Sequence, residues 1–353
     1  MSIRITARLV LSLAIMLMMS RASVQAEEGR WAIVLHGGAG NVSKDIPPER
    51  VQEYKQALEK AISTGEKILA DGGTALDAVQ QTVMVLEDAS CFNAGRGGVF
   101  NAAGYQQLDA SIMDGSNLAC GAVSAVEQVR NPITAARAVM EKTPHVLLTA
   151  KDADAFAKAS GLEIVPRSYF FNEDRWQELV RALKKSGRPV PAEPPYGRPK
   201  VSLAEPDLGD LDISTGTVGC AALDKHGNLA AATSTGGLTG KMVGRVGDSP
   251  IIGAGTYADN TGCAISGTGV GEQYIRNAIC FQVNFRVREN KQSLKEAVDH
   301  CLSKVLRPGD GGLIAVDAEG NMVLETNTET LTRGWSDWKG NRGVAIWDDP
   351  LED

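Results

Sequence analysis

The string Ser214-Thr215-Gly216-Thr217-Val218-Gly219 lies where a proline-rich stretch ends and an apolar, strand-like run begins. A threonine hydroxyl is a weak nucleophile unless a base lies beside it, and the α-amine of an N-terminal threonine is such a base. That amine has a reference pKa of about 8, so a useful fraction of it is neutral at about pH 7 without help from a histidine. Thr217 is therefore a candidate nucleophile if the chain is cut between Gly216 and Thr217.

The residue before the threonine suits such a cut. Gly216 can adopt the strained backbone that an N-to-O acyl shift requires, whereas a bulkier residue would clash. Gly-Thr pairs at strand starts are nevertheless common, so the pair alone also fits an ordinary turn that enters a strand.

The chain changes character around this junction. Residues 186–213 hold six of the 14 prolines, and because such a segment cannot form a central strand or a long helix, we expect an exposed, mobile linker. Before the linker, helical spacing of apolar residues predicts helices at 50–69, 75–86, 131–140 and 175–185. After it, the pattern predicts strand pairs at 218–223 with 229–232 and at 313–317 with 322–324, and helices at 271–281 and 293–306.

The region near position 31 carries a further strand signal. Residues 31–35 form an apolar run, which predicts a buried strand that opens into a glycine loop at residues 36–40. Strands and helices come in blocks rather than in strict alternation. This arrangement favours an α+β fold with sheet layers covered by helices, organised as one structural domain.

Composition and charge exclude several classes of protein. The 353 residues are 43% hydrophobic and 22% charged, which is typical of a soluble globular protein. The formal net charge is -7, whereas general binders of nucleic acid or of anionic membranes need a basic face. We therefore expect no nucleic-acid partner.

The N-terminus has the three parts of a secretory signal peptide. Arg4 and Arg8 precede an apolar run that ends near Met19, and small residues lead up to Ala26. The run is shorter than the roughly 20 residues that span a bilayer, and no later stretch is long enough. We expect cleavage after Ala26 and a periplasmic or secreted protein without a membrane partner after signal removal; an uncleaved anchor is the alternative.

Six cysteines follow the signal peptide, and their pairing stays open. Export permits disulfides, but wide and irregular spacing in a chain this long fits buried free thiols at least as well. No C-x-x-C occurs and only four histidines are present, so nothing supports a zinc site. The cysteines are Cys91, Cys120, Cys220, Cys263, Cys280 and Cys301.

Other catalytic and cofactor motifs are missing or incomplete. The sequence holds no G-x-S-x-G elbow and no H-E-x-x-H. Residues 236–241 resemble a phosphate loop, but Thr235 stands where its first glycine belongs and Met242 replaces the Ser or Thr that binds magnesium. Residues 267–271 are rich in glycine without the dinucleotide spacing. We predict no catalytic metal and no organic cofactor.

Several strings together closely resemble one family, the plant-type (type 2) L-asparaginases and isoaspartyl peptidases, which are N-terminal nucleophile (Ntn) hydrolases related to aspartylglucosaminidases. The resemblance runs in order from residue 31 to about residue 347, and the combination is highly specific although each string alone is weak. After the linker the strings are 216–219 (GTVG), 233–237 (TSTGG), 244–250 (GRVGDSP) and 268–272 (TGVGE). Before it they are 36–40 (HGGAG), 92–95 (FNAG), 108–110 (LDA) and 113–115 (MDG).

The resemblance implies a four-layer αββα sandwich that is made as an inactive precursor and cuts itself between Gly216 and Thr217. An α subunit of residues 27–216 and a β subunit of residues 217–353 would result, and two of each would associate as an (αβ)2 heterotetramer. Thr217 would be the nucleophile, with Thr235 supporting it. The Thr268 hydroxyl and the Gly269 N–H would stabilise the oxyanion, with Asn93 close by.

The expected substrate is an aspartyl residue held by its α-carboxylate and α-amine. Arg245 offers a planar fork suited to a carboxylate, and Asp248 can accept hydrogen bonds from an ammonium group. Without the resemblance, a local surface salt bridge between the two is the favoured interpretation. The residues expected to line the pocket are Arg245, Val246, Gly247, Asp248, Thr268, Gly269, Val270 and Gly271.

Two carry-overs from the family are less direct. Gly267 stands where relatives usually have Cys before the Thr-Gly pair, and we expect little effect because Thr268 and Gly269 are retained. The family also has a structural sodium loop with backbone carbonyl ligands, which leave no side-chain signal. Here the resemblance would place the loop at Leu86, Glu87, Phe92, Ala94 and Arg96.

The sequence therefore predicts an exported hydrolase of β-aspartyl (isoaspartyl) dipeptides and L-asparagine, acting through a covalent β-aspartyl ester on Thr217. Donors in an oxyanion site typically contribute a few kcal/mol each to such a reaction. A glycosylasparaginase, which differs in its leaving group, is one alternative. A non-catalytic periplasmic amino-acid-binding protein that uses Arg245 and Asp248 only as ligands is the other.

Overall fold

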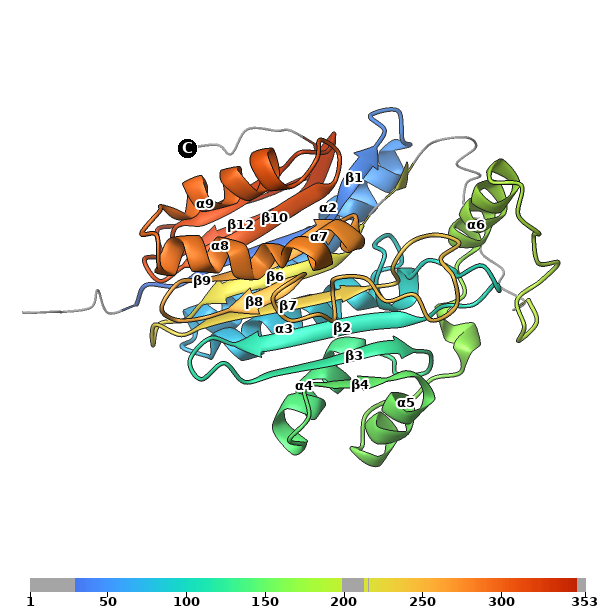
Figure 1. The fold of residues 1–353 in the computed structure, drawn as a ribbon, viewed down its shortest axis with the longest axis horizontal. Helices are drawn as coiled ribbons and strands as arrows, with labels where there is room; N and C mark the ends of the chain where they lie inside the picture. The colour runs from blue at the N-terminus through green and yellow to red at the C-terminus, as the bar shows by residue number, and fades with distance from the viewer. Residues whose placement is uncertain (1–28, 199–212, 215, 348–353) are drawn as a thin grey trace, which may run out of the picture.

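The computed structural model describes residues 29–198, 213–214 and 216–347. The expected signal peptide at 1–26 and residues 199–212 of the expected linker lie outside these ranges. The described part is an α+β fold in which helices and strands alternate in blocks (Figure 1).

Two sheets form the centre of the fold. In the larger sheet the strands follow the order β13 (Arg342–Ala345), β12 (Thr330–Asp337), β1 (Ala32–Val42), β6 (Val218–Leu223), β7 (Leu229–Thr235), β2 (Leu108–Asp114), β3 (Cys120–Val126) and β4 (Leu147–Thr149). The two-residue β5 (Ile213–Ser214) pairs with the end of β1. In the smaller sheet the order is β11 (Met322–Thr326), β10 (Gly311–Asp317), β9 (Cys263–Gly269) and β8 (Thr256–Ala258).

The prediction of a glycine loop at residues 36–40 is wrong. β1 continues through these residues to Val42, with a register shift between His36 and Gly38. At these residues β12 pairs with the strand as far as Gly40, whereas β6 pairs with it only as far as His36. These main-chain hydrogen bonds stabilise the strand although glycine has a low propensity for strands.

Most helices match the expected segments. Those predicted at 50–69, 75–86, 131–140 and 175–185 are α2 (Pro48–Ala70), α3 (Ala75–Asp88), α4 (Pro132–Lys142) and α6 (Glu173–Lys185). The helix predicted at 271–281 is broken at Ala278, where φ is 47°, into α7 (Gly271–Asn277) and α8 (Ile279–Arg288). The one predicted at 293–306 is α9 (Leu294–His300) followed by a π-helical turn. Helix α5 (Ala150–Ala159) was not predicted.

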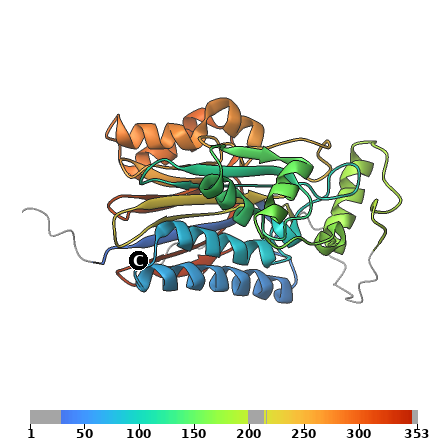
Figure 2. The same cartoon turned by 90° about the horizontal axis from the view of Figure 1, so that it is seen from below.

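Apolar side chains pack on both faces of the larger sheet. Along β1, Ile33 and Leu35 join the core formed with α2 and α3, whereas Ala32 and Val34 join the core shared with β9 and β10. This alternation is the period of two expected for a strand buried on both faces. Helices α8 and α9 pack on the smaller sheet through a separate core. Figure 2 shows these orange helices and the blue helices α2 and α3 on opposite sides of the strands.

The segment that leads to the candidate nucleophile is only partly described. Residues 186–198 are mostly exposed, yet several contacts attach them to the body of the protein, among them an ion pair between Arg198 and Glu173. The Arg188 guanidinium donates to the carbonyl of Gly240 at 2.8 Å, and the Tyr196 hydroxyl donates to Gln106 at 3.3 Å. The β5–β1 pair then brings the chain back beside β1, immediately before Gly216.

All six cysteines are free thiols, and all but Cys120 are buried. Among the described residues, the structure contains no helix with the length and apolar character needed to cross a membrane.

Candidate active site

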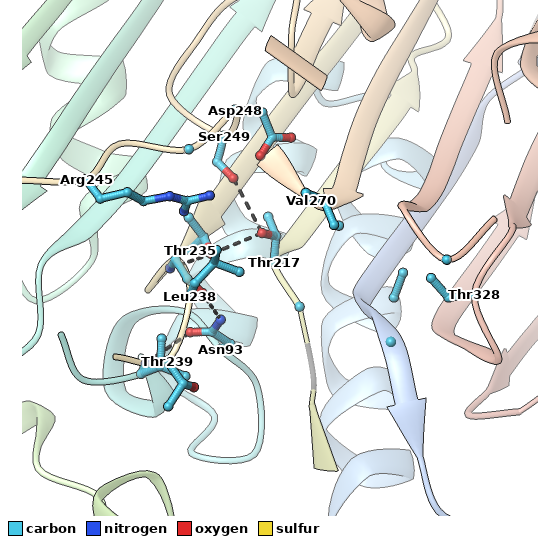
Figure 3. A pocket seen from close by; sticks show the side chains of 18 of the residues that line it. Asn93, Thr217, Thr235, Leu238, Thr239, Arg245, Asp248, Ser249, Val270 and Thr328 are labelled. Atoms are coloured by element: carbon cyan, nitrogen blue, oxygen red, sulfur yellow. Dashed lines mark hydrogen bonds between the residues drawn. The ribbon is translucent and has the colours of Figure 1, made fainter. Parts of the chain in front are cut away.

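Thr217 lies at the start of β6, in a cavity of about 330 Å³ (Figure 3). The residue is 7% exposed, so its hydroxyl is largely shielded from bulk water. Figure 3 shows polar side chains on two sides of Thr217, with Arg245, Asp248 and Ser249 on one and Asn93 and Thr239 on the other.

Thr235, the last residue of β7, holds the hydroxyl of Thr217. The Thr217 hydroxyl donates to Thr235 Oγ1 at 3.0 Å, and the Gly237 N–H donates to the same oxygen at 3.0 Å. The Ser249 hydroxyl oxygen lies 3.5 Å from Thr217 Oγ1. Since β6 and β7 are neighbouring strands, the sheet itself places the two threonines beside each other.

The bond between Gly216 and Thr217 is packed tightly against β1. Gly38 has a φ of 119°, and a Cβ on it would lie 2.5 Å from the backbone nitrogen of Gly216. A Cβ on Gly216 would in turn lie 2.5 Å from the hydroxyl of Thr268. That hydroxyl accepts the N–H of Ala39 at 3.2 Å. The junction therefore fits only because glycine occupies both positions.

Asn93 supports the turn that follows Thr235. Its side-chain amide donates to the carbonyl of Gly237 at 2.8 Å, and its side-chain oxygen accepts the N–H of Val99 at 3.0 Å. Asn93 thus ties the segment after α3 to the end of β7, next to the nucleophile.

A cation and a buried acid lie together on one side of Thr217 (Figure 3). The Arg245 guanidinium forms a two-point ion pair with Glu272. Asp248 is 3% exposed, and its Oδ2 has no hydrogen-bond partner within the described residues. Burial raises the pKa of Asp248 to about 7, while the nearby Arg245 charge acts in the opposite direction. A buried carboxylate oxygen without a partner is suited to receive a cationic ligand group.

The family described as Asparaginase (Asparaginase_2) matches residues 29–346 of the chain. The chain belongs to this asparaginase family. It is 42% identical to the isoaspartyl peptidase of Escherichia coli (strain K12) over 87% of the chain and 93% of the relative. It is 41% identical to the isoaspartyl peptidase/L-asparaginase of Homo sapiens over 91% of the chain and 98% of the relative. It is also 41% identical to the isoaspartyl peptidase/L-asparaginase of Xenopus laevis over 85% of the chain and 90% of the relative.

In this member of the asparaginase family, most of the predicted site residues line one cavity. They are Asn93, Gly216, Thr217, Thr235, Arg245, Gly247, Asp248, Gly269 and Val270. Thr268 lies directly behind Gly216, and Gly271 lies behind Asp248 and Arg245, where its Cβ would be 2.7 Å from Asp248 Oδ1. Val246 is half-buried beside them and does not line the cavity. The catalytic and binding roles of these residues stay predictions.

Sequence reasoning assigned no role to three residues that the asparaginase fold brings to the site. Ser249 lies within the string 244–250 and Glu272 ends the string 268–272, so their positions next to Asp248 and Gly271 were the available signal. His36, in the string HGGAG, contacts the main chain of Thr217 from 181 positions away. A single histidine in an apolar run carries no local signal for such a contact.

The predicted sodium-loop residues lie in one compact turn. Leu86 and Glu87 are in the last turn of α3, and Phe92, Ala94 and Arg96 follow in the segment that carries Asn93. The two parts meet at Gly95, where a Cβ would lie 2.5 Å from the Glu87 carbonyl oxygen. Among the described residues no three His, Cys, Asp or Glu side chains form a metal cluster.

Proposed function

We propose that this protein hydrolyses β-aspartyl dipeptides and L-asparagine, using Thr217 as an N-terminal nucleophile. The observation that carries the proposal is the Thr217–Thr235 hydroxyl contact of 3.0 Å in a cavity that also holds Arg245 and Asp248. Membership of the asparaginase family supports it, since relatives that cover most of the chain are named isoaspartyl peptidase or L-asparaginase.

The first chemical step is the cut that frees the nucleophile. The Thr217 hydroxyl oxygen attacks the carbonyl carbon of Gly216, and its proton ends on the Thr217 nitrogen as the peptide bond breaks. Water then hydrolyses the resulting ester, leaving a carboxylate on Gly216 and an amine on Thr217. The close packing of Gly38 and Thr268 around Gly216 supports this step because it holds the scissile bond beside the hydroxyl.

The catalytic cycle uses the same oxygen. The substrate α-carboxylate binds Arg245 and the α-ammonium binds Asp248, which places the side-chain carbonyl of the aspartyl group at Thr217. The freed amine takes the hydroxyl proton, Oγ1 attacks, and that proton passes to the departing amine or ammonia. Thr268 and the N–H of Gly269 stabilise the tetrahedral oxyanion. Water then cleaves the β-aspartyl ester and releases aspartate.

We further propose that the cut divides one structural domain into an α subunit, residues 27–216, and a β subunit, residues 217–353. We propose that this domain is a four-layer αββα sandwich and that two α and two β subunits associate as an (αβ)2 heterotetramer. The packing of α2 and α3 on one sheet and of α8 and α9 on the other supports the sandwich. Export after cleavage at Ala26 to the periplasm or medium is proposed from the N-terminal sequence alone.

We also propose a structural sodium ion at the turn after α3. The meeting of residues 86–87 with residues 92–96 at Gly95 supports it, because it gathers main-chain carbonyls in one place. Carbonyl oxygens suit hard cations such as sodium. A higher melting temperature in sodium chloride than in choline chloride at equal ionic strength would support the site; equal values would contradict it.

Intact mass and N-terminal sequencing of the purified protein, followed by an assay of aspartate release from β-Asp-Leu, test the proposed function. We expect a new terminus at Thr217 and product formation, both abolished in Thr217→Ala. An uncut chain that binds aspartate without turnover would favour the binding-protein alternative. Rapid turnover of GlcNAc-asparagine with little release from β-Asp-Leu would favour a glycosylasparaginase.

A further inference from the structure

His36 lies fully buried directly behind the nucleophile. Its Nδ1 is 2.8 Å from the main-chain carbonyl oxygen of Thr217, and its Nε2 is 2.8 Å from the hydroxyl oxygen of Ser266. Because a carbonyl oxygen only accepts hydrogen bonds, Nδ1 must carry the proton in this contact. Burial lowers the pKa of His36 to about 3, so the ring is neutral and Nε2 is an acceptor. The Ser266 hydroxyl must therefore donate to Nε2.

Ser266 is linked to two further buried hydroxyls. Thr233 Oγ1 lies 2.7 Å from Ser266 Oγ, and Thr256 Oγ1 lies 2.5 Å from Thr233 Oγ1. Since the Ser266 proton is committed to His36, the proton between Thr233 and Ser266 comes from Thr233, which also donates to the main-chain carbonyl oxygen of Gly255 at 3.1 Å. Thr256 donates to Thr233. The Thr217 carbonyl thus sets the tautomer of His36 and the direction of the Ser266–His36 hydrogen bond.

The far end of the series reaches the segment that carries Asp248. The Ser111 hydroxyl shares its proton between Thr256 Oγ1, at 2.8 Å, and the main-chain carbonyl oxygen of Ser249, at 2.5 Å. We call His36, Ser266, Thr233, Thr256 and Ser111 the hydroxyl network. It runs from the main chain of the nucleophile to the main chain beside the buried acid.

The hydroxyl network lies between the two sheets, where the remaining buried side chains are mainly apolar. Buried polar groups are costly unless all are paired, and paired networks fix one arrangement of the groups that they join. Gly219, in the string GTVG, gives an independent sign of this arrangement. A Cβ on Gly219 would lie 1.9 Å from Ser266 Oγ and 2.5 Å from His36 Nε2, so any side chain there would separate the two.

We propose that His36, held by the hydroxyl network, is a positioning residue that fixes the freed N-terminal Thr217 by its carbonyl. The inference rests on the proposed function. After the cut, Thr217 has no preceding residue, and the direction of its amine depends on how its own carbonyl is held. A fixed carbonyl keeps the amine beside the hydroxyl that it must deprotonate. The network touches neither Arg245 nor the side chain of Asp248, so it should affect kcat rather than KM.

The test compares Ser266→Ala with the wild-type enzyme on β-Asp-Leu, using only the fully cut form of each protein as checked by mass. Loss of the Ser266 donor leaves Nε2 unpaired, and we expect kcat to fall about tenfold while KM stays within about twofold. Ser124→Ala is the matched control, because Ser124 is a buried hydroxyl on β3 outside the network. Its kcat should equal that of the wild type. Thr233→Val, which preserves shape, replaces Ser266→Ala if the latter does not fold.

A double-mutant cycle separates this role from a merely structural one. His36→Asn keeps a donor near the position of Nδ1 but has no Nε2, so adding Ser266→Ala to it should change kcat by less than about twofold. Independent, multiplicative effects would overturn the inference, as would a Ser266→Ala enzyme with the kcat of the control. Neither of these two results would affect the proposed function. A wild-type chain that neither cuts itself nor releases aspartate would overturn both the inference and the proposed function.

Discussion

Arg245 and Glu272 form a two-point ion pair, with Nε 3.0 Å from Oε1 and Nη2 2.9 Å from Oε2. The pair occupies one edge of the planar guanidinium, and Gly247 and Gly271 pack against the same group. An arginine held in this way loses little further side-chain entropy when a carboxylate binds its remaining donors. If Arg245 binds the substrate carboxylate as proposed, Glu272 both prepares Arg245 for the substrate and offers it a competing negative charge.

Glu272→Gln should separate these two effects. If orientation dominates, KM for β-Asp-Leu rises by about three- to tenfold, kcat changes little and self-cleavage is unaffected, since the partly exposed pair contributes on the order of 1 kcal/mol. Steady-state kinetics on the cut enzyme check this expectation. A lower KM in the variant would mean that Glu272 acts mainly as a competitor.

Gly38→Ala should block self-cleavage. Its φ of 119° is unfavourable for alanine, and the added Cβ would lie 2.5 Å from the backbone of Gly216. Either the strand or the scissile bond must then move, and displacement of the reacting atoms by about 1 Å costs on the order of 100-fold in rate. Gel electrophoresis over time should show one intact chain.

The control for that variant is Gly161→Ala. Gly161 also has a positive φ, of 82°, but a Cβ there meets nothing within 4 Å. This protein should cut itself at the wild-type rate despite a similar backbone strain. Cleavage of Gly38→Ala at the same rate as Gly161→Ala would show that contact with Gly216 is unimportant.

The local sequence predicted most helices and both hairpins correctly, because the residues that signal these elements lie within a few positions of one another. Thr74, for example, caps α3 by accepting the N–H of Asp77, as expected for a threonine before an apolar, helically spaced run. The strand through residues 36–40 had no such signal, because its stability comes mainly from pairing with β12, which is distant in sequence. The break at Ala278 is likewise invisible locally, since alanine strongly favours helices.

The candidate site shows the same division. Arg245 and Asp248 belong to one short string, so their proximity followed from spacing. The contact between His36 and Ser266 joins positions 230 residues apart, on strands of different sheets. Only the packing of the two sheets reveals it. The glycines at 38, 216 and 219 were visible in the sequence, but the atoms that require them were not.

Activity should depend on the ionisation of Asp248. Burial raises the pKa of this carboxyl to about 7, so below that pH it takes up a proton and loses the charge that would bind the substrate ammonium. The Thr217 amine must also be neutral, and it becomes protonated over the same range. Two groups therefore lower kcat/KM together as the pH falls, and the logarithmic slope should approach two.

Asp248→Asn provides the comparison for this pH dependence. The amide does not titrate, so kcat/KM should be low throughout but fall with a slope of only one on the acid side. Profiles from pH 5 to pH 9 on the cut enzymes measure both slopes. Equal slopes would mean that Asp248 keeps one protonation state across this range.

Thr235→Val should impair both self-cleavage and turnover, because each begins with the Thr217 hydroxyl. The valine has the shape of threonine but removes the oxygen that accepts from Thr217 and from the N–H of Gly237. The buried Thr217 hydroxyl then lacks this acceptor, at about 1–3 kcal/mol, which corresponds to a loss of roughly 5- to 160-fold in either rate. Thr235→Ser keeps the oxygen and should retain most of both rates. A valine variant that cuts itself and turns over like the serine variant would show that Thr235 only fills space beside the nucleophile.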